Sequence, residues 1–529
     1  QEIGNYKKAN AYIDSLDDHR LMGHVLYQRY MGRDYKPTYR ELAEWMKIYA
    51  DLPRADKIYA LAQKRKPMKG DIALNPPHPG RGISTYHDYD SGQLAQPYMA
   101  EQEQTPRERD AVKSIGQTMS KNPTTAFGRL KNAAEKNVLK DTKFDAVQSQ
   151  VAESYFYNNN LDAAYKLSAN SSNRSGDDLP LAGWIAGLSA WRQGHYDEAA
   201  KHFEHTANSQ RASAWTASAG AYWAARSYLR SHQPQHVTYW LRRAAAHPRS
   251  FYGIIAVKAL GMEQIRYNWR LPDLTHVRLK SLAASLAGKR ALALKDVGRS
   301  DLAGMELWQM SPGGDKTLQE AMMAFAFEAD APAFQMRLAS GVQDADGNLY
   351  DAALYPDAPW EPKGGYQVDK ALIYAFIRQE SKFDADASNK DSGAMGLMQL
   401  MPATALNVAH KNGISVDKSH LQDPAINIRL GQKYIASLLQ DDNVKNNLFK
   451  LAVAYNAGPG KLSRWEKTVN YENDPLLFIE SIPVAETRLF VERVLTNYWI
   501  YRLKYKQDTD SLEKVAAGEW PVYTTLDFT

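Results

Sequence analysis

The sequence predicts an all-α protein, and three features of its pattern support that prediction. Apolar residues recur at helical spacing through most of the chain, the alternation typical of strands is scarce, and Asp, Pro and Gly stand where helices would begin and end. Hydrophobic residues make up 44% and charged residues 24% of the 529 residues, which is typical of a folded protein. Because this length exceeds what a single hydrophobic core supports, we expect about three domains.

The first half of the chain contains repeated helical hairpins. Segments 152–168 and 188–204 each have an aromatic helix, a polar turn and a D-x-A-x-K run, and 35 residues separate the matching positions Asp162 and Asp197, Ala164 and Ala199, and Lys166 and Lys201. A third, looser copy covers 221–245. Hairpins with a period of about 34 residues are typical of tetratricopeptide-like solenoids, in which each unit buries the apolar face of the next. We therefore expect a superhelical domain over residues 1–270.

The segments around and after the repeats suggest the remaining boundaries. Pro and Gly residues within 73–92 predict a long surface loop. Further helices are expected from about Leu271 to Ser340, and 341–365 then lacks helical periodicity and carries three prolines. We accordingly predict a helical linker domain over residues 271–345 and a separate C-terminal domain over residues 346–529.

The C-terminal domain is predicted to be a compact set of helices. Their expected ranges are 369–381, 402–413, 423–440, 446–458 and 483–505. Asp423 is expected to cap the third of them with Pro424 at its first position, and Gly413 and Gly458 are expected to follow helix ends.

Composition narrows the classes of function. The chain has no Cys, which excludes disulfides, zinc–thiolate sites and thiol nucleophiles. A formal net charge of +5 without a dense basic stripe predicts no nucleic-acid partner. No apolar run approaches the roughly 20 residues that cross a bilayer. The Asp-rich segments 384–395 and 344–351 match a calcium loop only in part, and we expect no metal and no cofactor. Because the chain starts with Gln1 and not Met, we expect a trimmed N-terminus.

One carboxylate stands out at the end of an apolar helix. Ile373, Phe376 and Ile377 precede Glu380 by seven, four and three residues, so they share its helix face. If that face is buried, desolvation and the negative end of the helix dipole raise the pKa of Glu380. A carboxylic acid that is still protonated near neutral pH can act as a general acid in glycosidic-bond cleavage. The alternative is a helix end whose acid faces water.

Three motifs in the last third of the chain resemble those of the soluble lytic transglycosylases. They are "ESKFDADASNKDSGAMGLMQLMPATA", "AYNAGPGKLSRW" and "ESIPVAETRLFVERVL", in the family's order, and the repeat-bearing helical half also fits. The resemblance implies a lysozyme-like catalytic domain and a carbon–oxygen lyase that cleaves the β-1,4 bond between N-acetylmuramic acid and N-acetylglucosamine of peptidoglycan. The muramyl C6 hydroxyl would replace water as the nucleophile and close a 1,6-anhydro ring. This reaction would explain why no second carboxylate is obvious near Glu380.

The resemblance also assigns roles to individual residues. Glu380 would be the catalytic acid and then the base, and Glu486 would contact the peptide stem. The other substrate-binding residues would be Ser388, Met398, Gln399, Tyr455 and Asn456. Ser388 lies in a loop that differs slightly in length from the family pattern, and Phe490 stands where the family usually has Tyr.

The same resemblance implies a cellular setting and partners. It predicts a monomeric periplasmic enzyme of cell-wall turnover in a Gram-negative bacterium, with outer-membrane association through a lipid anchor upstream of Gln1 left open. Glycan strands and stem peptides would be its substrates, and cell-wall synthesis proteins are candidate partners.

Simpler interpretations of these residues and of the chain stay open at this stage. Met395, Met398 and Met401 recur at helical spacing and would then fill a core, Gln399 would cap a turn, and Tyr455 would be structural. For the chain as a whole, the alternatives are a hydrolytic muramidase on the same fold and a helical-repeat protein that binds glycan without cutting it.

Overall fold

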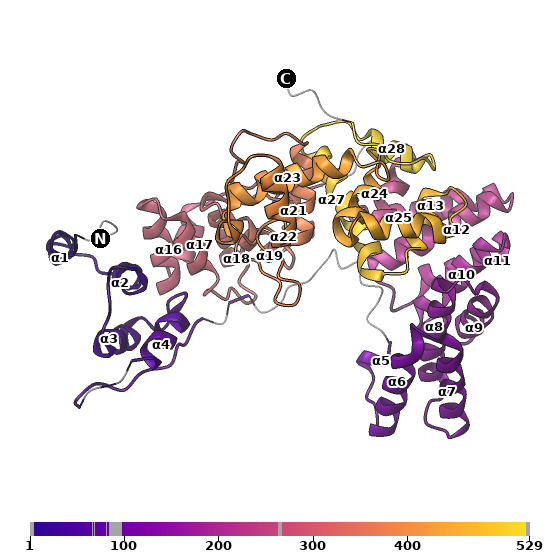
Figure 1. Ribbon diagram of the computed structural model, residues 1–529, viewed down its shortest axis with the longest axis horizontal. Coiled ribbons are helices and arrows are strands. Elements are labelled where there is room, and N and C mark those ends of the chain that lie inside the picture. Colours follow the sequence, from indigo (N-terminus) through magenta and orange to yellow (C-terminus); the bar gives the residue numbers. More distant parts are fainter. Residues whose placement is uncertain are drawn as a thin grey trace. The chain divides into compact units, whose positions relative to one another are not determined.

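The computed structural model describes residues 5–65, 67, 69–80, 82–83, 98–262 and 267–524, and its regular elements in these ranges are helices joined by loops (Figure 1). In them no β-strand forms, only isolated bridges such as Ser388–Met395 and Met395–Leu400. The predicted all-α class is confirmed. None of the helices in the described ranges combines the length and apolar character that spanning a membrane requires.

The chain divides into two compact units that do not follow a simple order along the sequence. One unit combines Gln1–Tyr89 with Tyr267–Trp360, and the other combines Asp90–Arg266 with Glu361–Thr529. The division into residues 1–270, 271–345 and 346–529 stays a prediction, but the first 89 residues group with the segment after the repeats. The predicted loop at 73–92 is irregular at 73–80 and 82–83, and its remaining residues lie outside the described part.

The first unit consists of short helices from both of its segments. They are α1 (Tyr6–Asp14), α2 (Met22–Met31), α3 (Tyr39–Tyr49), α4 (Ala55–Gln63), α15 (His276–Leu282), α16 (Leu286–Asp296), α17 (Ser300–Leu307), α18 (Lys316–Glu328), α19 (Pro332–Ala339) and α20 (Asp351–Leu354). Leu42, Trp45 and Ile58 are fully or almost fully buried in the core of α2–α4. The carboxylate of Glu306 on α17, also fully buried, accepts hydrogen bonds from His24 at 2.7 Å and from Arg290 at 2.8 and 2.9 Å. Such pairing compensates for the desolvation of the buried charges.

The second unit begins with the predicted repeats. Its helices up to residue 262 are α5 (Tyr98–Glu101), α6 (Pro106–Met119), α7 (Pro123–Glu135), α8 (Asp141–Tyr157), α9 (Leu161–Ser175), α10 (Pro180–Arg192), α11 (Tyr196–Asn208), α12 (Ala214–Arg230), η1 (Pro234–His236), α13 (Val237–Ala245) and α14 (Phe251–Ala259). The hairpins α8–α9, α10–α11 and α12–α13 coincide with the three sequence repeats.

The repeat register predicted from the sequence recurs in the contacts between hairpins. Asp162 accepts a hydrogen bond from Gln193 at 2.7 Å, and Asp197 accepts one from Gln233 at 2.6 Å. The matched positions Ala164 and Ala199 are both fully buried. Equivalent residues thus make equivalent contacts with the following hairpin, as a stacked array requires.

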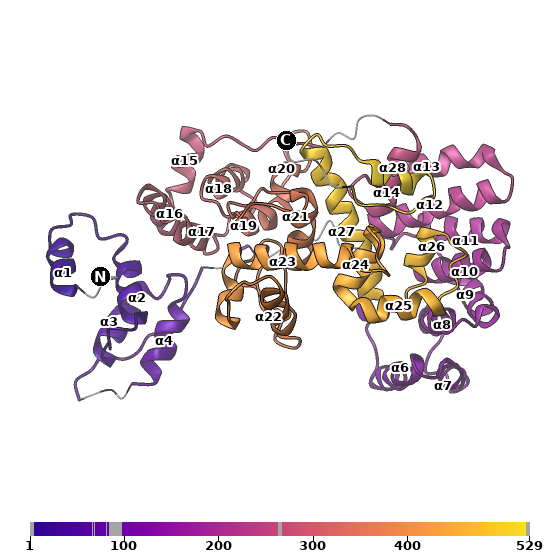
Figure 2. The same ribbon diagram turned by 45° about the horizontal axis from the view of Figure 1, so that its top comes forward.

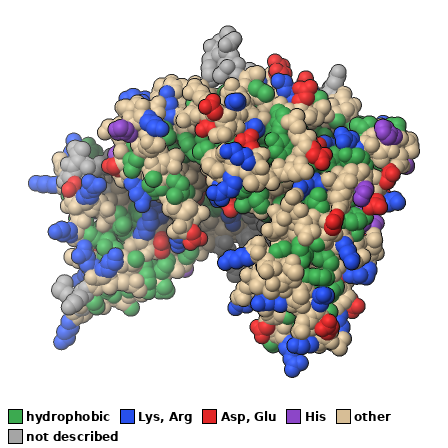
Figure 3. All heavy atoms as spheres, turned by 45° about the vertical axis from the view of Figure 1, so that its right-hand side comes forward, with side chains coloured by type: hydrophobic (Ala, Val, Ile, Leu, Met, Phe, Trp, Pro, Cys, Tyr) green, Lys and Arg blue, Asp and Glu red, His purple; other side chains and the backbone are tan. Residues whose placement is uncertain are grey.

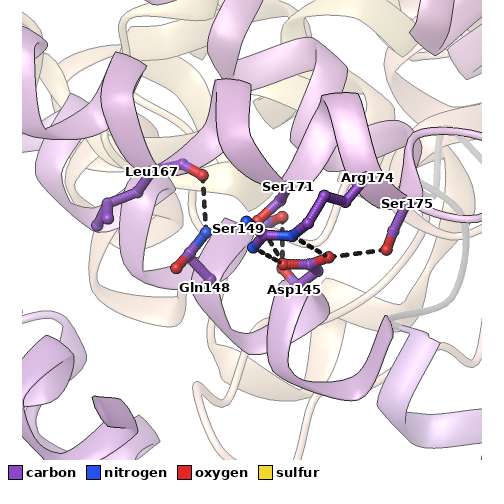
Figure 4. A network of polar contacts seen from close by, with 7 residues as sticks. All are labelled: Asp145, Gln148, Ser149, Leu167, Ser171, Arg174 and Ser175. Atoms are coloured by element: carbon purple, nitrogen blue, oxygen red, sulfur yellow. Dashed lines mark hydrogen bonds and ion pairs between the residues drawn. The ribbon is translucent and has the colours of Figure 1, made fainter. Parts of the chain in front are cut away.

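A buried acid joins the two helices of the first hairpin (Figure 4). Asp145 of α8 is 2% exposed and accepts hydrogen bonds from Arg174 and from Ser175, the latter at 2.8 Å, both on α9. Gln148, also on α8, donates to the carbonyl oxygen of Leu167 at 3.0 Å. These polar contacts fix the spacing of α8 and α9 within the hairpin.

The second unit ends with the helices predicted for the C-terminal domain. They are α21 (Lys370–Glu380), α22 (Pro402–Lys411), η2 (Lys418–Gln422), α23 (Pro424–Leu439), α24 (Leu448–Ala457), α25 (Pro459–Thr468), α26 (Pro475–Glu480), α27 (Ala485–Lys504) and α28 (Asp510–Ala516). All five expected helices form, and Asp423 caps α23 as predicted. The sequence-based prediction missed α25 and α26, each of which starts at a Pro, and it also missed η2 and α28. Figure 2 shows α27 beside α21 and α24, and these helices are in contact.

Candidate active site

Helix α21 carries Glu380 at its last position. All residues from Ala371 to Arg378 are buried, so the apolar run is the buried core helix of the domain. Ile373, Phe376 and Ile377 are each fully buried, which confirms the predicted apolar face. Glu380 itself is half-buried, so its carboxyl group stands where the core ends and solvent begins.

Near neutral pH the carboxyl group of Glu380 is mainly in its protonated, uncharged form. Burial raises its pKa from 4.5 to about 8, and the nearby carboxylate of Glu486 adds to the rise. Among the described residues, Glu380 forms no hydrogen bond or ion pair that would stabilise its charged form. The predicted rise is therefore present, and a like charge reinforces it.

Aromatic rings form a wall next to this carboxyl group. The ring of Tyr455 lies 4.5 Å from that of Phe376, 5.4 Å from that of Tyr434 and 6.3 Å from that of Phe490, to which it is nearly parallel. The Tyr455 hydroxyl donates to the carbonyl oxygen of Met398 at 2.8 Å. Burial and the neighbouring Glu380 raise the pKa of Tyr455 well above its usual value. Tyr455 is thus both a structural tyrosine and a neighbour of the acid.

The loop after α21 turns sharply back on itself. Lys382 and Phe383 have positive φ angles of 52° and 65°, and the peptide N–H of Gly396 donates to the carbonyl oxygen of Ala387 at 2.8 Å. Gly396 has φ +76°, and a Cβ there would lie 2.3 Å from both the side chain of Asn427 and the carbonyl oxygen of Leu421. A glycine is therefore required for the loop to pack against α23.

Asn427 is a residue of this site that sequence reasoning missed. It is fully buried, and its amide group donates to the carbonyl oxygens of Met395 at 3.1 Å and Leu421 at 2.7 Å. Its side-chain oxygen accepts from the backbone N–H of Met398 at 2.8 Å. The only signal in the sequence was an Asn among the apolar positions of a predicted helix.

Gln399 is oriented by the same loop. Its side-chain amide N–H groups donate to the carbonyl oxygens of Ala387 at 3.1 Å and Gly396 at 2.9 Å, and its φ is +43°. The side chain therefore ties the turn together, as the simpler interpretation held, and its amide oxygen stays available as an acceptor. Both interpretations of Gln399 are compatible with this geometry.

The three methionines of the loop do not share one environment. Met398 is fully buried, and its sulfur atom would lie only 2.1 Å from a Cβ at Gly431, so it fills the core against α23. Met401 is 42% exposed. The helical spacing suggested by the sequence is not realised, because left-handed residues at Gly396 and Gln399 turn the chain here. The side chain of Met398 has no access to a substrate in this conformation.

Ser388, Asn456 and Glu486 lie on three different segments. Ser388 is exposed on the loop, and its hydroxyl makes no hydrogen bond with Glu380. The hydroxyl of Thr487, which is 1% exposed, donates to the side-chain oxygen of half-buried Asn456 at 2.7 Å. Glu486 is exposed in the first turn of α27, and its charge acts on Glu380. Phe490 completes the aromatic wall and has no hydroxyl to offer.

Comparison with known proteins relates this geometry to a family. Residues 359–478 match the sequence model of the Transglycosylase SLT domain. This segment is thus similar in sequence to SLT domains. It includes Glu380, the loop and Asn456, whereas Glu486 lies beyond the matched segment.

Matches to two known proteins support the predicted resemblance. The chain is 28% identical over 276 residues to the soluble lytic murein transglycosylase of Escherichia coli. This alignment covers 51% of this chain and 41% of that protein. A putative soluble lytic murein transglycosylase of Haemophilus influenzae is 30% identical over 146 residues, or 27% of this chain and 24% of that protein. The matched region thus spans about two fifths of the Escherichia coli relative. The resemblance to soluble lytic transglycosylases is confirmed.

Solved structures share the fold beyond the matched segment. An inactive mutant of the lytic transglycosylase Slt from Pseudomonas aeruginosa has a TM-score of 0.60 with 22% identity, over 96% of this chain and 80% of that one. The 70 kDa soluble lytic transglycosylase of Escherichia coli has a TM-score of 0.54 with 17% identity, over 99% of both chains. A complex of the 70 kDa soluble lytic transglycosylase with bulgecin A also matches, with a TM-score of 0.55 and 18% identity.

Among the residues that the structure describes, no group of three or more His, Asp or Glu is arranged to hold a metal ion. The Asp-rich loop after Glu380 instead forms local turns, in which Asp384 accepts from the backbone N–H of Asp386 at 3.0 Å.

Proposed function

We propose that this protein is a lytic transglycosylase that cleaves the β-1,4 bond between N-acetylmuramic acid and N-acetylglucosamine in peptidoglycan. The observation that carries the proposal is the half-buried carboxyl group of Glu380. Its pKa is raised to about 8, and no cation or hydrogen-bond donor among the described residues neutralises it. It is thus protonated near neutral pH and free to donate its proton.

The proposed reaction needs one enzyme carboxyl group in two steps. Glu380 donates its proton to the glycosidic oxygen, the bond from that oxygen to the muramyl C1 breaks, and N-acetylglucosamine leaves with a free hydroxyl. The Glu380 carboxylate then removes the proton from the muramyl C6 hydroxyl, whose oxygen bonds to C1 and closes the 1,6-anhydro ring. No water is consumed, and the acid is regenerated.

The surroundings of Glu380 support an intramolecular nucleophile. Phe376, Tyr455 and Phe490 build an apolar wall at the carboxyl group, which disfavours an ordered, activated water on that side. Gln399 offers an amide oxygen as an acceptor, and Asn456 is oriented by Thr487. We propose Gln399, Tyr455 and Asn456 as cleft residues, and exposed Ser388 as a contact of the substrate rather than of the acid.

The position of the substrate-contacting methionine is revised. Because Met398 is fully buried and Met401 is 42% exposed, we propose Met401 in its place. Glu486 is exposed at the edge of the site, where a carboxylate suits the amino groups of a stem peptide.

A hydrolytic muramidase is the second candidate, and one observation favours it. Glu486 is a second carboxylate close enough to raise the pKa of Glu380, which was not apparent from the sequence. Inverting glycosidases use such a second carboxylate to activate water. The exposure of Glu486 leaves room for that water, so the products have to decide between the two reactions.

We further propose that the protein acts in the periplasm of a Gram-negative bacterium, where peptidoglycan lies, as a monomer without a cofactor. The resemblance to soluble murein transglycosylases supports this setting. On the face shown in Figure 3, basic and acidic side chains are interspersed, which suits an uncharged glycan better than a nucleic acid. Proteins of cell-wall synthesis are candidate partners.

The test is mass spectrometry of muropeptides released from purified peptidoglycan by the wild type and by Glu380→Gln. We expect products one water lighter than reducing-end muropeptides, and their loss in the variant. Reducing-end products that disappear in Glu486→Gln would identify the hydrolase. Binding to peptidoglycan without any release would identify a glycan-binding protein and overturn both enzymatic proposals.

A further inference from the structure

The first turns of α27 contact two different parts of the unit, one on each face of the helix. Glu486, Thr487 and Phe490 face the candidate active site, through the pKa of Glu380, the side chain of Asn456 and the ring of Tyr455. Residues at the complementary helical spacing face the repeat helices of the same unit, namely Ala485, Arg488, Leu489 and Glu492. One helix therefore touches both the site and the solenoid.

A small cavity of about 40 Å³ marks the contact on the repeat side. The repeats contribute Trp184 and Trp215 to its lining, the following helix α14 contributes Tyr252, and α27 contributes Ala485, Arg488 and Leu489. Around it lies a group of charged residues that we call the docking cluster, defined as Glu153, Glu480, Arg488 and Glu492.

Donors on the repeat helices bind the acids of the docking cluster directly. The indole N–H of Trp215 on α12 donates to the carboxyl group of Glu492 at 2.6 Å, and the Tyr252 hydroxyl on α14 donates to that of Glu480. Arg488 donates to Glu153 of α8 at 3.4 Å and, within its own segment, to the carbonyl oxygen of Ile482 at 2.6 Å. Its guanidinium also lies 4.4 Å from the ring centre of Tyr157.

The two acids on the α26–α27 side also lie close to each other. Glu480 and Glu492 are 3% and 5% exposed, and their carboxyl groups lie close enough for each to act on the pKa of the other. Two ionised carboxylates have only acceptors and repel each other, so a direct hydrogen bond between this pair would need a proton on one of them. Burial, the dominant cause for each, raises the pKa of both groups.

We propose that the docking cluster positions α27 for the reaction: the repeat helices hold one face of α27 through a Glu480–Glu492 pair that shares one proton, and thereby hold Glu486, Thr487 and Phe490 at the active site. Trp215, Arg488 and Glu492 are accordingly positioning residues that touch no substrate. The inference rests on the proposed function for its catalytic consequence, but the positioning itself is independent of it.

Loss of the shared proton should loosen the contact. The charged and titratable groups that face the pair are Glu153 and Tyr157 from α8, Tyr252 from α14, and Arg488 and Arg493 from α27. Ionisation of both acids places two negative charges beside Arg488, which already faces Glu153. We therefore expect the first turns of α27 to become less protected at alkaline pH.

The experiment is hydrogen–deuterium exchange on the full chain, followed in residues 485–491, with residues 370–380 of α21 as an internal reference. Trp215→Phe removes the indole donor and keeps most of the ring. Glu492→Gln keeps an acceptor for Trp215 and supplies a permanent donor to Glu480. Glu513→Gln is the matched control, because Glu513 also pairs with a repeat residue, Lys258 of α14, but on the surface.

In Trp215→Phe we expect exchange at 485–491 to rise at least about tenfold with α21 unchanged, and kcat to fall about 10- to 100-fold with a smaller change in KM. In the wild type, exchange at 485–491 should rise from mildly acidic to alkaline pH beyond the chemical rate. Glu492→Gln should abolish that extra rise and retain activity, and Glu513→Gln should match the wild type.

Unchanged protection of 485–491 in Trp215→Phe, or an equal loss of protection throughout the unit, would overturn positioning in favour of a purely structural contact. An alkaline rise that persists in Glu492→Gln would overturn the shared proton. If Trp215→Phe does not fold, the pH comparison of Glu492→Gln with the wild type decides. If no variant and no wild type cleaves peptidoglycan, the proposed function fails, while the exchange results still test the positioning.

Discussion

Glu380 and the docking cluster are two places in the same unit where carboxyl groups are partly or fully buried. They differ in the side chains that surround these carboxyl groups. Glu480 and Glu492 are met by the hydroxyl of Tyr252, the indole of Trp215 and the charge of Arg488. Glu380 is met by aromatic rings and by another acid, Glu486. In both places burial is the main cause of the raised pKa.

The difference teaches how one physical effect serves two purposes. In the docking cluster, donors and a cation offset the desolvation, so the buried acids hold two parts of the unit together. At Glu380 the desolvation is left uncompensated and keeps a proton available for donation. An unpartnered acid at the edge of the core is costly for stability and useful for chemistry.

The largest expected effect is at Glu380 itself. Glu380→Gln should lower peptidoglycan cleavage by about 10³-fold or more, because the amide cannot transfer a proton. The variant should nevertheless be at least as stable as the wild type. A shift in pKa from 4.5 to about 8 corresponds to at most about 5 kcal/mol, which partial exposure reduces, so we expect a gain on the order of 2 kcal/mol above pH 8.

The sign of this gain follows from the raised pKa. Below about pH 4.5 the group is protonated in both the folded and the unfolded chain, so the variant and the wild type should be equally stable. As the pH rises from about 4.5 to about 8, the unfolded wild type releases this proton while the folded wild type still holds it, so the wild type loses stability. The variant has no such proton and does not lose it. Urea unfolding of both proteins across this range measures the gap, and a gap that closes at alkaline pH would contradict the buried acid.

Removing the cation of the docking cluster should lower stability, whereas removing the acid at Glu380 should raise it. Arg488→Met should lower the free energy of unfolding by about 3–5 kcal/mol, because it leaves buried acids without their compensating charge. Arg464→Met, at an exposed position of α25, is the control and should change it by less than about 0.5 kcal/mol. Equal effects of the two substitutions in chemical denaturation would show that the cluster contributes no net stability.

A smaller loss of stability is expected when the hydroxyl of Tyr455, which bonds to the core behind the active site, is removed. Tyr455→Phe leaves the buried carbonyl oxygen of Met398 without its 2.8 Å donor and should cost about 1–2 kcal/mol of stability. Tyr434→Phe is the matched control, since the Tyr434 ring lies in the same wall. Chemical denaturation of the two variants should separate them, and a larger loss for Tyr434→Phe would refute the role given to the hydroxyl bond.

The smallest effect separates the two causes of the raised pKa of Glu380. In the wild type, kcat/KM should fall as the pH rises through about 8, because the acid then loses its proton. Glu486→Gln removes a like charge, which favours the ionised form, so this alkaline limb should move to lower pH. It should stay well above pH 4.5, because burial is the larger cause. An unmoved limb would mean that Glu486 does not act on the acid.

Local features of the fold and site could be predicted because neighbouring residues determine them. The apolar run of α21 has no polar face, so it had to be a buried helix with Glu380 at its end. The repeats followed from residues 35 apart, and the ends of α23 and α24 followed from Asp423 and Gly458, whose roles depend on their own backbone geometry. The sequence by itself therefore determined the five long helices of the C-terminal segment, the repeat register and the acid.

Only the tertiary structure decided what faces that acid. Glu486 stands more than 100 residues from Glu380 in the chain, and nothing local shows that α27 brings the two carboxylates together. Met398 and Met401 look alike in sequence, and the positive φ of Gln399 sends one into the core and the other to solvent. The docking cluster likewise exists only because repeats and α27 bury each other's polar groups. Long-range pairing depends on which surfaces exclude water together, and that is a property of the whole packed unit.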